Sequence, residues 1–145
     1  MPILNYTTKI HSAKTVGEIQ HILARAGARS INIDYDDHAQ PVAVTFLVNV
    51  TGRLVNFRLP SNWRGVWARL RDDPAVPRNL RTEEQSRRVA WRIVKDWCEA
   101  QMAIIDSGLA ELTEVFLPYA VNPESGQTLF QEFQASKLLT AGDDQ

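Results

Sequence analysis

Arginines crowd the middle of this sequence, where their chemistry suits a polyanion. Residues 53–95 carry eleven lysines and arginines against four acidic residues, whereas residues 96–145 carry one lysine against nine acids. The planar guanidinium forms paired hydrogen bonds to phosphate and stacks on aromatic rings. Such asymmetry indicates a polyanionic partner, unless the acidic third of the chain folds back and neutralises the basic third.

A nucleic-acid site is predicted around the start of a long helix. Free N–H groups and the helix dipole favour an anion in the first turns of a helix. Arg88 and Arg92 lie four residues apart and therefore share a helix face. Aromatic side chains among the cations can stack on bases. The predicted nucleic-acid-binding residues are Arg64, Arg78, Arg81, Arg87, Arg88, Arg92, Lys95 and Trp63.

A structural interpretation of the same residues competes with this one. Tryptophans at helical spacing are more often core, covered by the stems of neighbouring arginines. We expect Trp67 and Trp97 to be core and Trp63 and Trp91 to be exposed. The acidic residues near the cations can also pair with them and leave nothing for a ligand. These residues are Glu83, Glu84 and Asp96.

One cluster in the sequence has metal-ligand chemistry. Asp34, Asp36, Asp37 and His38 lie at a strand end and a turn, and hard cations require several converging oxygens. The sequence favours a solvated turn over a metal site there, and no cofactor is predicted. Known nucleophile, phosphate-loop and zinc motifs are absent, and the single Cys98 lies mid-helix. We therefore predict a protein that is not an enzyme.

The elements that position these residues predict an α+β fold. Alternating apolar residues predict strands at 30–35, 42–50 and 54–59, joined by turns too short for a crossover. They form a three-stranded antiparallel meander that packs on a long, kinked or broken helix, with short flanking helices. Capping signals start a helix at Thr15 that ends before Gly27. Ser61 is expected to cap a short helix, and another is predicted over 128–139.

The long helix is predicted from Thr82 to about Tyr119. Thr82 and Gln85 match a capping box, and Pro118 ends the apolar pattern. Gly108 is a weak point inside this stretch and predicts either a kink or a boundary between two helices. The residues expected to be buried in this helix and in the strand facing it are Trp97, Ile104, Phe46 and Val48.

The length predicts a single domain over residues 1–145, with loosely ordered ends at 1–14 and 141–145. No apolar run is long enough to span a bilayer, and the first residues lack the features of a signal peptide. A cytoplasmic location and no membrane partner are therefore expected. An exposed edge of the sheet could pair with its copy in a homodimer.

The order of helix, meander and helix is similar to that of double-stranded-RNA-binding domains. The stretches PVAVTFLVNVTGRLVNF and QSRRVAWRIVKDW carry this similarity. The resemblance implies that Arg87 and Arg88 touch phosphates, although residues 60–81 insert a helix and a loop that the family lacks. Separately, VAWRIVKDWCEAQMAIIDSGLAELTEVFLPYAV resembles small proteins encoded by bacterial phages and prophages, which implies an accessory role.

Three classes of function remain open from the sequence. The first is a phage or mobile-element accessory protein that binds DNA or RNA backbone without reading its sequence. The second is a protein-binding inhibitor or adaptor that uses the acidic C-terminal half or the sheet edge. The third is an enzyme without a recognisable motif. We predict the first class, because it makes the sharpest claims, and neutralisation of the arginines within the fold would favour the second.

Overall fold

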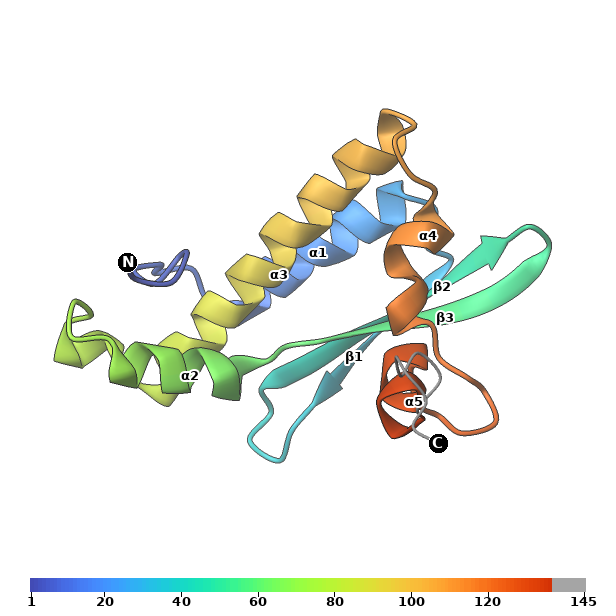
Figure 1. Cartoon of the computed structure of the whole chain (residues 1–145). Coiled ribbons are helices and arrows are strands. Elements are labelled where there is room, and N and C mark those ends of the chain that lie inside the picture. Colours follow the sequence, from blue (N-terminus) through green and yellow to red (C-terminus); the bar gives the residue numbers. More distant parts are fainter. Residues whose placement is uncertain (137–145) are drawn as a thin grey trace, which may run out of the picture.

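A computed structural model describes residues 1–136 of the chain and contains one sheet with its two longest helices over one face (Figure 1). The strands are β1 (Ser30–Tyr35), β2 (Pro41–Val50) and β3 (Arg53–Pro60). The α-helices are α1 (Ser12–Arg25), α2 (Trp63–Asp72), α3 (Glu83–Asp106), α4 (Leu112–Phe116) and α5 (Leu129–Ala135). Two short 3₁₀ helices are η1 (Arg78–Leu80) and η2 (Leu117–Tyr119). The α+β fold with a three-stranded antiparallel sheet is thereby confirmed.

The sheet is the predicted meander in the order β1-β2-β3. Thr51 and Gly52 both adopt positive φ, which is the backbone of a tight hairpin between β2 and β3. Alternate residues of β2 and β3 point to one face and are buried, as the apolar alternation predicts. The opposite face carries the Asp34–Arg58 ion pair, which reaches from β1 to β3 across the central strand.

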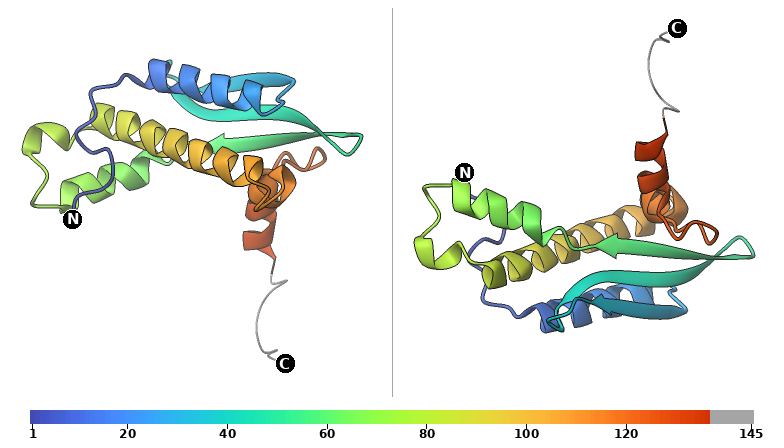
Figure 2. Two further views of the ribbon diagram at one scale, coloured as in Figure 1. Left: turned by 90° about the horizontal axis from the view of Figure 1, so that it is seen from above. Right: turned by 90° about the horizontal axis from the view of Figure 1, so that it is seen from below.

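The buried face of the sheet packs against α1 and α3. These two helices both begin at the same end of the molecule and run side by side in the same direction (Figure 2). The core between the layers includes Ile19, Phe46, Phe57, Trp91 and Phe116, which are all almost completely buried. Phe116 packs edge-on against Phe46 with ring centroids 5.4 Å apart. This main core holds the sheet and both helices as one unit.

A second, smaller core lies between α2 and the first half of α3. It contains Trp63, Val66, Leu70 and Val89, with Tyr6 from the N-terminal segment packed against it. The N-terminal segment is also held by Gln85, whose Nε2 donates to the carbonyl oxygens of Tyr6 at 2.9 Å and Thr8 at 2.8 Å. The insertion at 60–81 therefore lies against the amino-terminal half of α3. Residues 141–145, expected to be a loose end, lie outside the described residues.

Four local predictions need correction. Helix α1 begins at Ser12 rather than Thr15, because Thr15 is fully buried inside the helix and His11 is the N-cap. Asn62, not Ser61, precedes α2 as its N-cap. Thr82 does cap α3 by accepting from the Gln85 amide, but the Gln85 side chain reaches the N-terminal segment instead of closing a capping box. Trp63 and Trp91, expected to be exposed, are 6% and 0% exposed.

Two further positions are less buried than predicted. Phe46 and Val48 are buried as expected, whereas Trp97 and Ile104 are only partly buried. Trp97 packs edge-on against Phe116 and Tyr119. Trp91, and not Trp97, is the completely buried tryptophan of the core between α3 and the sheet.

The long apolar stretch is two helices separated at Gly108. Helix α3 ends at Asp106, and Gly108 adopts a φ of +80°, a conformation that favours glycine just after a helix. The following segment, residues 107–136, we call the C-terminal arm. It contains α4, η2 and α5. The helix predicted over 128–139 begins after its N-cap Thr128 but ends at Ala135, because the C-cap Ser136 has an extended backbone. Residues 137–139 lie outside the described residues. Among the described residues, no helix is both long and apolar enough to cross a membrane.

Candidate interaction surfaces

Arg87 lies at the centre of a contact between three elements. Its Nη2 lies 2.9 Å from Asp36 Oδ2 in the β1–β2 turn and 3.1 Å from Glu83 Oε2 one helical turn earlier. Its guanidinium stacks over the Trp63 ring of α2 at 4.0 Å. The residue is only 6% exposed. Arg87 therefore holds the turn and α2 on the start of α3, and most of its guanidinium is engaged within the fold.

The next three predicted cations of α3 also have carboxylate partners. Arg88 pairs with Glu84 on the preceding turn. Arg92 Nη1 lies 2.7 Å from Glu18 Oε1 of α1, and Lys95 Nζ lies 2.6 Å from Glu99 Oε1. Exposed pairs of this type contribute little to stability, but each one lowers the positive potential that would attract a polyanion.

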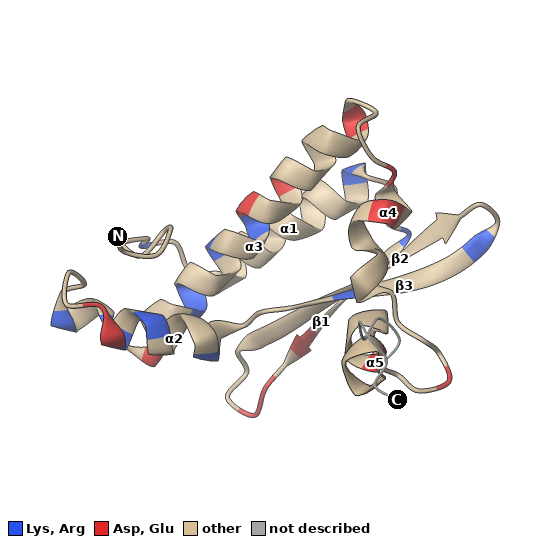
Figure 3. Ribbon diagram, in the orientation of Figure 1, with Lys and Arg blue, Asp and Glu red and all other residues tan. Residues whose placement is uncertain are grey.

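Asp96, the third acid expected to pair with the arginines, accepts a hydrogen bond from Asn5 Nδ2 at 2.8 Å instead. Glu83 and Glu84 do pair as anticipated. The charges at the start of α3 are thus neutralised pair by pair within the fold. Figure 3 shows the cations of α3 nearer its start and acidic residues in its second half.

Arg81 forms hydrogen bonds to backbone carbonyl groups of the loop that precedes α3. Its Nε donates to the carbonyl oxygen of Val76 at 2.9 Å, and its Nη2 donates to that of Asp73 at 3.2 Å. These bonds close the loop between α2 and α3. Buried carbonyl groups require such partners, so this arginine is explained by the loop.

The remaining predicted cations lie on α2 and just after it. Arg64 and Arg78 are exposed, and neither forms an ion pair within residues 1–136. Arg71, seven residues from Arg64, is also exposed and has no ion pair in that range. Arg64 and Arg71 stack over the rings of Trp63 and Trp67 at 4.4 Å and 4.5 Å. Arg64 and Arg78 are therefore the part of the predicted site that is free to meet an anion, and Arg71 joins them as a cation that the prediction did not include.

The acidic turn has structural partners rather than the arrangement of a metal site. Asp34 pairs with Arg58, and Asp36 Oδ1 accepts from the amides of His38 at 2.8 Å and Gln40 at 3.0 Å. The amide of Gln40, that of His38 and the Arg87 guanidinium lower the pKa of Asp36. Among the described residues, no three His, Cys, Asp or Glu side chains converge as metal ligands would. Asp37 and His38 are exposed at the turn.

Cys98 is completely buried in the main core. Burial, with a contribution from the Glu99 charge, raises the pKa of its thiol to about 12. A thiol in this state is a poor nucleophile near neutral pH, because the thiolate is the reactive form. Cys98 is therefore a small core residue.

The C-terminal arm presents apolar side chains to solvent. Leu129, Phe130 and Phe133 of α5 are 38%, 49% and 41% exposed, and Leu117 of η2 is 47% exposed. Helix α5 has no buried residue. It projects away from the layer formed by the sheet and the main helices (Figure 2). The apolar residues of this segment predict the helix, but not that its apolar face is exposed among residues 1–136.

The base of the arm is firmly attached. Phe116, Ala120 and Thr128 are buried, and Phe57 of β3 forms an isolated bridge with Ala120. The amide of Val121 donates to the carbonyl oxygen of Asn56 at 2.8 Å, which extends the edge of the sheet. Thr128 and Gln131 form a reciprocal capping box at the start of α5. The exposed apolar residues are thus held in one place by a buried support.

Comparison with known proteins adds no relative: no family model, no curated protein and no solved structure matches this chain. The similarities to double-stranded-RNA-binding domains and to phage-encoded proteins therefore stay predictions.

Proposed function

We propose that this protein is a non-catalytic protein-binding module whose contact element is the C-terminal arm. The observation that carries the proposal is the exposure of Leu129, Phe130 and Phe133 on a helix with no buried residue. Helices this short are not stable in water by propensity alone and depend on packing of their apolar face. Contiguous exposed apolar side chains on a soluble domain are typical of an interaction site.

The spacing of the exposed residues fits a groove on the partner. Leu129 and Phe133 are four residues apart, and Phe130 lies three before Phe133, so the three side chains share one helix face. Short amphipathic helices bind proteins by placing such a face into an apolar groove. The buried support of the arm holds the face in position before binding, which lowers the entropic cost of association.

The charge of the arm indicates which residues surround that groove on the partner. Residues 107–136 contain Glu111, Glu114, Glu124 and Glu132 but no lysine, arginine or histidine. A partner with lysines and arginines around an apolar groove is electrostatically complementary to this surface. A second copy of the arm is a poor occupant, because like charges would meet across a symmetric contact. We place this binding in the phage or mobile-element accessory role that the sequence resemblance implies.

Site-specific photo-crosslinking tests the proposal. A photoreactive phenylalanine analogue at position 133 should crosslink to one protein of the source cell, and the same analogue at Arg25 at the far end of α1 should not. The purified captured protein should then bind the wild-type chain, and the double change Phe130→Ser and Phe133→Ser should weaken binding at least tenfold. Leu54→Ser, at an exposed apolar position on the open sheet face, is the matched control. Equal crosslinking from both positions, or equal binding by both variants, contradicts the proposal.

Nucleic-acid binding is the second candidate, and a separate observation supports it. Arg64, Arg71 and Arg78 are exposed and form no ion pair within residues 1–136. Arg64 and Arg71 also lie over tryptophan rings, a position from which a guanidinium can stack on a base. This candidate moves the proposed contact from the start of α3 to α2 and η1. Its test closes the Discussion.

A further inference from the structure

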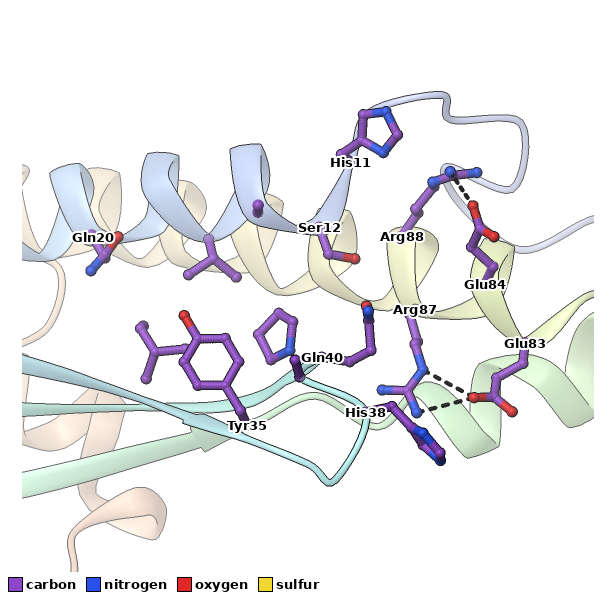
Figure 4. A pocket seen from close by; sticks show the side chains of 15 residues that line it. His11, Ser12, Gln20, Tyr35, His38, Gln40, Glu83, Glu84, Arg87 and Arg88 are labelled. Carbon is purple, nitrogen blue, oxygen red and sulfur yellow. Dashed lines mark hydrogen bonds and ion pairs between the residues drawn. The ribbon is translucent and has the colours of Figure 1, made fainter.

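A cleft of about 810 Å³ opens where α1 and α3 begin, opposite the β1–β2 turn (Figure 4). Its size lies within the range of small-molecule sites in proteins. Its walls come from three segments that are far apart in the sequence: the start of α1, the turn after Tyr35 and the first two turns of α3. It is separate from the C-terminal arm and shares no residue with it.

The start of α1 gives the cleft hydrogen-bond donors. Ser12 and Ala13 line the cleft and are the first two residues of α1, whose amides have no acceptor inside the helix. His11, the N-cap, makes no side-chain cap bond, and the first turn of α1 holds no acidic residue. The positive end of this helix dipole is therefore not balanced by its own turn, an arrangement that favours an anion.

A buried nitrogen of Arg87 that lacks a hydrogen-bond partner independently indicates a ligand in this cleft. Its Nε and Nη2 donate to Glu83, and Nη2 also meets Asp36, but its Nη1 is buried without a hydrogen-bond partner among the described residues. In Figure 4 dashed lines join two Arg87 nitrogens to Glu83, and the third nitrogen, Nη1, points away from Glu83 and toward the cleft. An unsatisfied buried donor costs about 1–3 kcal/mol, and more when it is charged. An acceptor oxygen of a ligand would remove this cost.

The acidic side chains of the cleft do not cancel these donors. Glu83 is engaged by Arg87, which also meets Asp36, and Glu84 is engaged by Arg88, so each of these acids already has a cationic partner. The start of α1 remains as excess positive potential, because its first turn carries no acid, whereas Glu83 and Glu84 stand in the first turn of α3. The rest of the wall includes apolar surface from Val16, Ile33, Tyr35 and Pro41. A ligand that fits both parts carries an oxyanion at one end and an apolar body at the other.

We propose that this cleft binds a small organic acid, with its carboxylate or phosphate oxygens at the start of α1 and beside Arg87. The apolar body of the acid lies against the side chains of Tyr35, Ile33 and Pro41. A phosphate of a nucleic acid has the same oxyanion chemistry but lacks the apolar body, so the probes below separate the two sources. This proposal does not depend on the function proposed for the arm.

Calorimetric titration with phenyl phosphate and phenylacetate tests it, with inorganic phosphate and a single-stranded oligonucleotide as comparison probes. At least one aromatic acid should bind saturably with a Kd of about 1 mM or tighter, as expected of a ligand of this size. Inorganic phosphate should bind at least tenfold more weakly. Saturable binding of neither aromatic acid, or equal binding of inorganic phosphate, overturns the proposal. An oligonucleotide that displaces the aromatic acid and binds more tightly assigns the cleft to nucleic-acid phosphate and also overturns it.

Ala13→Asp is the decisive variant. Ala13 is exposed, so the change does not disturb the core, and a carboxylate in the first turn should raise the Tm of the unliganded protein through the helix dipole. The same carboxylate should repel the probe and weaken its binding at least tenfold. Ala24→Asp places the same change at the other, exposed end of α1 and should leave binding unchanged. Equal probe affinity of a folded Ala13→Asp protein and the wild type excludes the α1 terminus from the site. Binding of the arm's partner should be unaffected by either variant.

Discussion

Arg87 Nη2 and Asp36 Oδ2 lie 2.9 Å apart and join the start of α3 to the turn between β1 and β2. Asp36 in turn accepts from the amides of His38 and Gln40, which fixes the shape of the turn. On its other side, the Arg87 guanidinium covers Trp63 of α2. One side chain thus connects the sheet, the inserted helix and the longest helix. This connection explains an arginine that the sequence alone assigns to phosphate.

Removing the Asp36 charge should change how stability depends on pH. The hydrogen bonds from Gln40 and His38, with the Arg87 charge, lower the pKa of Asp36 in the folded protein. Its contribution to stability is therefore complete above the unfolded pKa of about 3.9 and is lost as the pH falls through the folded value. Urea unfolding between about pH 6 and pH 2 should give Asp36→Asn a lower free energy of unfolding than the wild type at the upper end of this range. This free energy should also fall less steeply in the variant as the pH is lowered. Asp37→Asn, at the exposed neighbouring position, is the control and should follow the wild-type curve.

Replacing Trp91 by Ala should cost about 3–5 kcal/mol of unfolding free energy, the usual cost of removing a fully buried aromatic side chain. Trp91 is completely buried, and its Nε1 donates to the carbonyl oxygen of Pro41 at 3.1 Å. Trp97→Ala should cost less, because Trp97 is only partly buried. Urea denaturation measures both. A loss below about 1 kcal/mol for Trp91→Ala would show that α3 packs on the sheet through another face.

Cys98 should resist thiol reagents while the protein is folded. Its thiol is completely buried and has a pKa raised to about 12. At pH 8 a disulfide reagent should therefore react with the native protein much more slowly than with the urea-unfolded chain. Opening of the core should limit the native rate, so destabilising Trp91→Ala should accelerate the reaction. Equal rates for the folded and unfolded wild type would contradict the burial of Cys98.

The sheet edge expected to form a homodimer is restricted to β1. The edge of β3 is occupied in part by Ala120 and Val121 of the arm. The outer edge of β1 has no strand beside it among the described residues. If β1 pairs with its copy, Asn32→Pro should break the dimer, because proline lacks the N–H and is tolerated poorly in a paired strand. A monomer in sedimentation experiments at tens of micromolar protein would contradict the predicted homodimer.

The sheet could be predicted from sequence because its signals are local. The alternation in Val42–Val50 and the Thr51-Gly52 turn define the hairpin without reference to the rest of the chain. The end of α3 is less well defined by the sequence, because a glycine within an apolar pattern is compatible with both a kink and a boundary between helices. The positive φ of Gly108 decides for a boundary.

Whether an arginine of the central segment is free or neutralised depends on ion pairs between residues that are distant in sequence. Composition predicted a basic centre correctly, but Arg92 meets Glu18 and Arg87 meets Asp36 only after α1 and the turn are packed on α3. The burial of Trp63 and Trp91 has the same origin. A tryptophan beside arginines is compatible with base stacking and with burial under arginine stems, and tertiary contacts decide between them.

Nucleic-acid binding at low salt tests most directly whether the central arginines serve the fold. Fluorescence anisotropy with single- and double-stranded DNA and RNA would be measured on the wild type and on the triple variant Arg64→Ala, Arg71→Ala, Arg78→Ala. With most other central cations paired, we expect no Kd tighter than about 100 μM, weaker than ordinary non-specific binding. Tight binding with a steep salt dependence, flattened in the triple variant, would instead make α2 and η1 a phosphate-binding surface and nucleic acid the partner.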